Sequence, residues 1–184
     1  MHEMRFELMN GSRSRSGSSM IELPFVLWTL FLGLLVPMIC LATIGIRYTF
    51  FLNASRQAVH VAAQAKSFSQ DFSPNLSAQT LAQQTATACC KGFSGVTLNA
   101  VNTSIVITPV QPGSPQIQQP TKLSSPADEE NFLYQIQVQL IGQSDPFIPL
   151  PQGVFGFKIP GLTDPYPIQT TAKEPSENTQ GLNQ

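Results

Sequence analysis

Two adjacent cysteines, Cys89 and Cys90, are the most unusual local feature among the side chains that could do chemistry. Thiols tend to oxidise outside the cytoplasm, but neighbouring cysteines bridge each other only through a strained ring. The pair therefore indicates one buried thiol with one intermolecular disulfide, or no bridge at all. Together with Cys40 they make three cysteines, whereas a zinc site needs about four ligands, so no metal site is expected.

Two further groups of side chains invite a chemical interpretation. The acidic cluster Asp128–Glu130 is most simply a solvated loop, with a weak cation site as the alternative. His60 lies in an alanine-rich stretch and is more typical of a structural or surface histidine than of a general base. The sequence contains no glycine-rich phosphate loop, no Gly-x-Ser-x-Gly elbow and no His-Glu-x-x-His helix. We therefore expect no catalytic residues and no cofactor.

A run of 24 residues without a charged side chain, Leu23 to Ile46, begins directly after Glu22 and ends at Arg47. As a helix it would be about 36 Å long, and a bilayer core of about 30 Å needs about 20 such residues. A buried core helix rarely stays apolar over this length, and the apolar region of a cleaved signal peptide is shorter, about 7–15 residues. The run predicts a transmembrane helix, which Pro37 should kink.

Glu22 is unusual because a carboxylate beside an apolar span is costly at bilayer depth and is usually functional there. Five residues before it stands Gly17, which follows a basic stretch containing Arg13 and Arg15. The alternative is that Glu22 is an interfacial residue at the start of the helix, where the helix dipole favours a negative charge.

The order of these features (a basic leader, Gly17, four residues, Glu22 and an apolar run) resembles a type IV prepilin signal. The resemblance implies that a membrane aspartyl peptidase cuts between Gly17 and Ser18. It also implies an assembly role for Glu22, whose carboxylate would pair with the N-terminal amine of a neighbouring subunit in a low-dielectric helix bundle. An unpaired charge there would cost several kcal/mol of desolvation.

The sequence from residue 13 to about residue 65 is similar to the TadE/TadG-like proteins of tight-adherence (Tad, Flp-type) pilus systems. The likeness rests on the Gly-Ser-x-x-x-Glu junction at Gly17, one span, and an aromatic- and alanine-rich continuation. It implies a non-catalytic pseudopilin or minor pilin-like protein in pilus assembly. Its partners would be the membrane, other pilin-like or Tad assembly subunits, and the prepilin peptidase. Three alternatives stay open: a pseudopilin of another secretion system, a binding module on an uncut signal anchor, and an extracytoplasmic enzyme.

Charge bears on both partners and orientation. The formal net charge is −1 and only 11% of residues are charged, which provides no electrostatic reason to expect nucleic acid. The positive-inside rule gives a tie, with three basic residues on each side of the span: Arg5, Arg13 and Arg15 before it, and Arg47, Arg56 and Lys66 after it. A short leader with a prepilin-like junction indicates a single-pass protein of the inner (cytoplasmic) membrane, with the N-terminus in the cytoplasm and the C-terminal domain outside it.

Beyond the span, helix signals precede strand signals, which predicts an α+β fold. An amphipathic helix should continue from Arg47 to about Ser69, and a second helix should run from about Ala78 to Cys90, with Ser73 or Ser77 as its cap. The apolar stripe of the first helix consists of Phe50, Ala54, Ala58, Val61, Ala65 and Phe68.

Alternating side chains predict strands near 96–107, 132–141 and 168–173, which should form a small antiparallel sheet with one face in solvent. Long Pro-rich loops, 111–126 and 143–167, should connect them. The predicted organisation is a basic leader (1–17), the transmembrane helix with its extension (18–69), an extracytoplasmic α+β domain (70–173) and a disordered tail (174–184).

Overall fold

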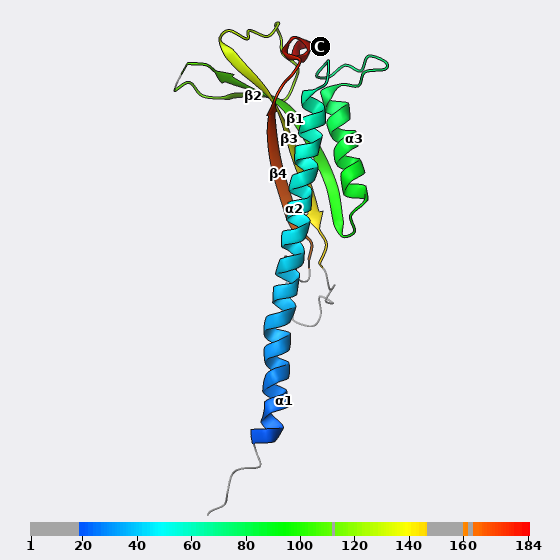
Figure 1. The fold of residues 1–184 in the computed structure, drawn as a ribbon, viewed down its shortest axis with the longest axis vertical. Coiled ribbons are helices and arrows are strands. Elements are labelled where there is room, and N and C mark those ends of the chain that lie inside the picture. The colour runs from blue at the N-terminus through cyan, green and yellow to red at the C-terminus, as the bar shows by residue number, and fades with distance from the viewer. Residues whose placement is uncertain (1–18, 112, 147–159, 162–163) are drawn as a thin grey trace, which may run out of the picture. The chain divides into compact units, whose positions relative to one another are not determined.

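A computed structural model describes residues 19–111, 113–146, 160–161 and 164–184. The chain divides into two compact units, Met1–Ile39 and Cys40–Gln184, and each is considered by itself. Figure 1 shows a long N-terminal helix and a small sheet with helices, which agrees with the predicted α+β class.

The described part of the first unit is helical. Helix α1 spans Ser19–Leu30, a π-helical turn, η1, follows at Phe31–Leu35, and α2 begins at Val36 and runs to Ala63. Pro37 accounts for the π-helical turn, because its ring excludes the carbonyl of the residue four positions earlier and it has no N–H to donate. The disturbance predicted at Pro37 therefore takes the form of a widened turn immediately before it.

Helix α2 ends at Ala63, earlier than the predicted end near Ser69. Its last carbonyls are bonded by a distant part of the chain: Glu177 N donates to Ala63 O at 3.0 Å, and Asn178 Nδ2 donates to Gln64 O at 3.3 Å. Because the C-terminal segment satisfies these carbonyls, the helix stops without a glycine or proline near its C-terminal end.

The buried face of α2 is also shifted from the predicted stripe. Phe51 is fully buried, whereas Phe50 is half-buried and stacks on Phe93 with ring centroids 3.9 Å apart. Phe50 and Val61 of the predicted stripe are thus only half-buried, because adjacent apolar residues fit neighbouring rows of a helix equally well. The buried residues of the helix are Cys40, Phe51, Ala54, Ser55, Ala58, Val59, Ala62 and Ala63.

Helix α3, Ala78–Lys91, agrees with the prediction, and of the two candidate caps the structure uses Ser77. The Ser77 hydroxyl accepts a hydrogen bond from Thr80 N at 3.3 Å, and Ser77 N donates to Asp71 Oδ1 at 2.6 Å. That backbone hydrogen bond is the main reason why the pKa of Asp71 lies below its usual value. The cap is thus a small network in which Asp71 holds the capping residue in place.

Replacing Ser77 by alanine should lower the free energy of unfolding by about 1 kcal/mol, because Thr80 N loses its acceptor. Ser73→Ala is the matched control: it removes the same atom from the predicted cap that the helix does not use, and it should have a smaller effect. Chemical denaturation of both variants, followed by circular dichroism, tests the expectation. Equal losses would contradict the assignment of the cap.

Four antiparallel strands form one sheet in the order β2-β1-β3-β4 (Figure 1). Their bounds are Val96–Pro109 for β1, Ile117–Gln119 for β2, Phe132–Ser144 for β3 and Tyr166–Pro175 for β4. The three strands expected from the sequence are present and longer than predicted. Segment 111–126 was predicted as a loop throughout, and this is wrong at β2, which pairs with Ile105–Ile107. The predicted long loop 143–167 lies largely outside the described residues.

The core of the second unit forms where α2 and α3 cover one face of the sheet. Small side chains on the helices, such as Ala58 and Ala82, pack in one cluster with Ile105, Ile136 and Leu140 on the strands, and none of these five is more than 1% exposed. Alanine on a helix lets its backbone approach the large strand side chains closely, which keeps the core densely packed. On the opposite face the alternating glutamines of β3 are partly exposed, except for Gln137, which is 8% exposed.

The C-terminal segment corrects another expectation. The tail from Glu174 was predicted to be disordered, but β4 continues to Pro175 and a 3₁₀ helix, η2, spans Thr179–Asn183. Leu182 is 2% exposed, and its carbonyl accepts a hydrogen bond from Leu123 N at 2.8 Å. One leucine in a polar sequence is a weak signal, and the docking that buries it depends on residues far away in the chain.

Candidate functional site

Glu22 lies in the first turn of α1 and is exposed. An acidic side chain in this position interacts favourably with the positive end of the helix dipole. Gly17 and Ser18, the residues of the predicted processing site, lie outside the described residues. The structure therefore describes only the helical half of the prepilin-like junction.

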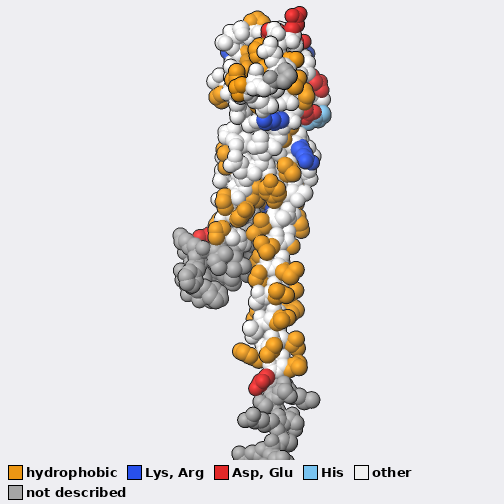
Figure 2. Space-filling model, turned by 90° about the vertical axis from the view of Figure 1, so that its left-hand side faces the viewer, with side chains coloured by type: hydrophobic (Ala, Val, Ile, Leu, Met, Phe, Trp, Pro, Cys, Tyr) orange, Lys and Arg blue, Asp and Glu red, His pale blue; other side chains and the backbone are white. Residues whose placement is uncertain are grey.

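The apolar side chains that follow Glu22 point outward (Figure 2). In the part of the chain that the structure describes, one helix, Glu22–Ala63, is long and apolar enough to span a membrane, and only 6% of its most apolar 18-residue segment is buried. A core helix of a soluble domain would be mostly buried, whereas a membrane anchor or a signal sequence has this exposed apolar surface. In the first unit the large apolar side chains that are 54–75% exposed are Leu23, Phe25, Val26, Leu27, Trp28, Leu30, Phe31, Leu32, Leu34 and Met38.

The uncharged stretch of the helix ends at Arg47, within α2. Its guanidinium donates to Ser144 Oγ at 3.1 Å and also to the backbone carbonyl of Asp145. Gly95 makes room for this arrangement: its φ is +77°, and a Cβ at this position would clash with the guanidinium. Arg47 therefore joins the end of the apolar stretch directly to the end of β3. The sequence indicated Arg47 only as a boundary charge, since its main acceptor is a backbone carbonyl distant in the chain.

All three cysteines are free thiols in the structure. Cys90 is buried, and burial raises the pKa of its thiol. Cys89 is half-buried, and its sulfur lies 3.1 Å from Gln57 Oε1, to which it donates a hydrogen bond. One thiol of the pair is thus buried, as expected, and the disulfide from the other stays a prediction.

The acidic cluster builds a turn rather than a shared binding site. Asp128 Oδ2 accepts a hydrogen bond from Asn131 Nδ2 at 2.8 Å, the main cause of its lowered pKa, and Asp128 Oδ1 accepts one from Glu130 N at 3.2 Å. Glu129 instead accepts a hydrogen bond from the Thr179 hydroxyl. Within the described ranges, no group of three or more histidine, cysteine or carboxylate side chains could hold a metal ion.

His60 connects α2 to β4. Its Nδ1 lies 2.8 Å from Glu174 Oε1, and the two side chains are 59% and 33% exposed. The hydrogen bond and the charge of Glu174 raise the pKa of His60 above its usual 6.5, with a smaller contribution from the charge of Glu177. The pair needs residues 114 positions apart, so no local pattern in the sequence could reveal it.

The His60 pair has a testable pH dependence. A folded-state pKa above the unfolded value means that the pair stabilises the domain fully below about pH 6.5 and that this contribution is lost as the pH rises through the folded pKa. In Glu174→Gln we expect the pKa of His60 to fall toward its unperturbed value, measured by NMR titration of the imidazole. Glu177→Gln, which removes a charge but no hydrogen bond to His60, should cause a smaller decrease. An unchanged pKa in Glu174→Gln would contradict the pairing.

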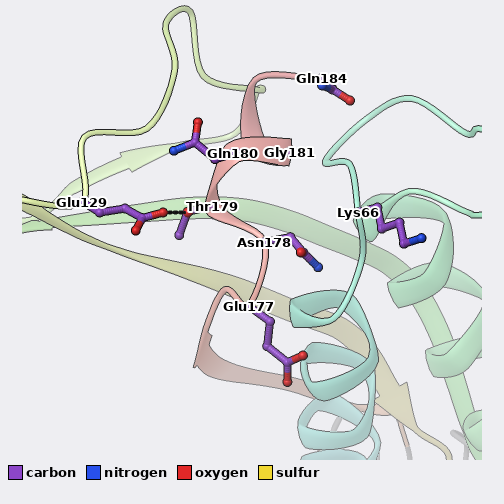
Figure 3. A pocket seen from close by; sticks show the side chains of 8 residues that line it. All are labelled: Lys66, Glu129, Glu177, Asn178, Thr179, Gln180, Gly181 and Gln184. Carbon is purple, nitrogen blue, oxygen red and sulfur yellow. Dashed lines mark hydrogen bonds between the residues drawn. The ribbon is translucent and has the colours of Figure 1, made fainter.

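A shallow recess at the C-terminal end is the remaining candidate. Figure 3 shows that its side chains do not converge: Lys66 and Glu177 point in different directions, and Glu129 is engaged by Thr179. Catalysis and specific small-molecule binding need polar groups that meet at one point. The recess therefore supports neither.

The predicted site residues are divided between the two units, since Glu22 belongs to the first unit and Cys89 and Cys90 belong to the second.

No protein-family model, no curated protein and no solved structure matches the chain.

Proposed function

We propose that this chain is a membrane-anchored, non-catalytic pilin-like subunit, a TadE-like pseudopilin or minor component in the assembly of a Tad-type pilus. The observation that carries the proposal is the position of Glu22, in the first turn of an exposed apolar helix. The prepilin-like junction around Gly17 and the α+β domain that follows the helix support it.

In this proposal the apolar helix first holds the chain in the inner membrane, with the leader in the cytoplasm and the domain outside. The prepilin peptidase hydrolyses the bond between Gly17 and Ser18, which leaves a new amine on Ser18. When helices of several subunits bundle, the Glu22 carboxylate of one subunit pairs with this amine on its neighbour. Since an uncompensated charge in the bundle would cost several kcal/mol, the pair sets the axial register of the subunits.

The experiment is the intact mass of the membrane-extracted protein, with and without a co-expressed prepilin peptidase. We expect a chain that begins at Ser18 only when the peptidase is present. Gly17→Val should block the cut, and Gly11→Val, a matched change in the same leader, should leave it intact. A chain that still begins at Met1 beside an active peptidase would favour an uncleaved, signal-anchored binding protein.

The role of Glu22 needs a separate measurement. Glu22→Gln should be inserted into the membrane and cut but should fail to co-purify with pilus subunits, because a neutral amide cannot neutralise the partner's amine. Glu22→Asp keeps the negative charge and should co-purify with pilus subunits to a greater extent than Glu22→Gln. If both variants assembled normally, Glu22 would be an interfacial residue only. Co-purification with the subunits of a different secretion system would move the assignment to a pseudopilin of that system.

A further inference from the structure

One end of the sheet lies where the apolar helix enters the domain. The strand register places Val96 of β1, Ser144 of β3 and Tyr166 of β4 side by side at this end. Arg47 of α2 is hydrogen-bonded to Ser144 and to the carbonyl of Asp145. The last turns of the apolar stretch and this end of the domain are therefore joined without a linker.

The surface at this end is apolar and aromatic. Ile46 is 63% exposed, Tyr48 is 45% exposed, and Tyr166 is 41% exposed. A groove beside α2 at the same level is lined mainly by small and apolar side chains, among them Ala42, Gly45, Ile46, Phe50 and Phe93. Tyrosines with an apolar ring and a polar hydroxyl are typical of the interface between lipid and water.

Among the described residues at this end the charged side chains are Arg47, Asp145 and Asp164, and Lys91 at the end of α3 is exposed. The Arg47 guanidinium is bound to the domain, and Asp145 and Asp164 are half-buried. Among these described side chains, only Lys91 would bring an exposed charge toward a bilayer, and a lysine can extend its ammonium group into the headgroup layer.

From this continuity between an exposed apolar helix and an exposed apolar end of the domain, we propose that the end around Tyr48 and Tyr166 lies in the headgroup layer of the membrane and is a lipid-contacting surface. The domain would then rest on the bilayer rather than stand clear of it. The proposal depends on the membrane span of the proposed function, but not on processing at Gly17 or on any pilus partner.

The opposite end of the sheet provides an internal control. Leu133 on β3 pairs with Thr108 on β1 and is 48% exposed, similar to Tyr166. It is separated from Ser144 by about 36 Å, at about 3.3 Å per strand residue. A surface at Tyr166 that touches lipid thus leaves Leu133 in water.

The test uses the full chain in phosphatidylcholine vesicles and the fact that Trp28 is its only tryptophan. In a Trp28→Phe background, single tryptophans are placed by Tyr166→Trp, Leu133→Trp and Leu34→Trp. Their fluorescence is compared in ordinary lipid and in brominated lipid, with the bromines near the headgroup end of the acyl chains for positions 166 and 133 and near the end of the chains for position 34, which lies at the middle of the span. We expect brominated lipid to quench tryptophan at position 166 and to leave tryptophan at position 133 unchanged. Tyr48→Trp, on α2, is a second probe of the same surface and should also be quenched.

The outcomes separate this surface from the span. Quenching at position 34 but not at 166 or 48 would overturn the lipid-contacting surface and leave the span in place. Absence of quenching at all four positions would overturn the span itself, and with it the anchor in the proposed function. Equal quenching at 166 and 133 would show that the domain does not rest on the membrane at one defined end, which also overturns the inference.

Discussion

The double variant Phe31→Arg with Leu34→Arg is expected to lose its attachment to the membrane. Both side chains are more than half exposed near the middle of the apolar stretch, so neither substitution disturbs a packed core. Each arginine near the centre of a membrane helix costs about 2.5–3.5 kcal/mol, and two of them remove most of the preference for the bilayer. Extraction of membranes with alkaline carbonate measures the effect, and the variant should appear in the soluble fraction.

The matched control places the same two charges at the ends of the stretch, with Leu23→Arg and Ile46→Arg. Arginines there can extend their side chains into the headgroup layer, so the control should stay with the membrane. Both variants replace two apolar residues of the stretch by arginine and carry the same net charge, so the main difference between them is the depth of the two charges. If both were released, or if the central variant stayed behind with the pellet, the apolar helix would not be a span.

Phe51→Ala should have the largest effect on the stability of the domain. Phe51 is fully buried, and its ring lies against Gly142 on β3, where an added Cβ would be 2.9 Å from the Phe51 Cζ atom. Truncating a buried phenylalanine usually costs about 3–5 kcal/mol, because the removed ring leaves a cavity. Native domains are stable by only about 5–15 kcal/mol, so this is a large share. Denaturation in detergent, followed by circular dichroism, measures it.

Phe25→Ala is the control for this variant, because Phe25 is 75% exposed in the first unit and its truncation should leave the domain's stability unchanged. A second test uses the contact between the Phe51 ring and Gly142. Gly142→Ala should destabilise the domain because its Cβ meets both Phe51 and the carbonyl of Thr97, and Phe51→Leu should partly rescue it by removing the ring atoms. Strictly additive effects of Gly142→Ala and Phe51→Leu would contradict the packing described here.

Local sequence patterns predicted the helices and strands that are specified by residues close together in the chain. The apolar stretch before Arg47 and helix α3 follow from composition and spacing, whereas the choice of Ser77 over Ser73 as the cap came from the structure. The alternation in Phe132–Ile141 identified β3, since a half-buried strand must alternate its side chains. Gly17 and Glu22 were likewise found from their spacing, and their roles are tested only by the experiments proposed above.

Contacts between distant segments decided the rest, because the free energy of such a contact depends on both partners being brought together. The end of α2 at Ala63 depends on donors at Glu177 and Asn178, and the choice of Phe51 over Phe50 depends on the position of the sheet. The same holds for the ordered C-terminal segment around Leu182. Arg47 illustrates both sources: its place after the apolar run marks a boundary in the sequence, but only the fold supplies the carbonyl of Asp145 that it binds.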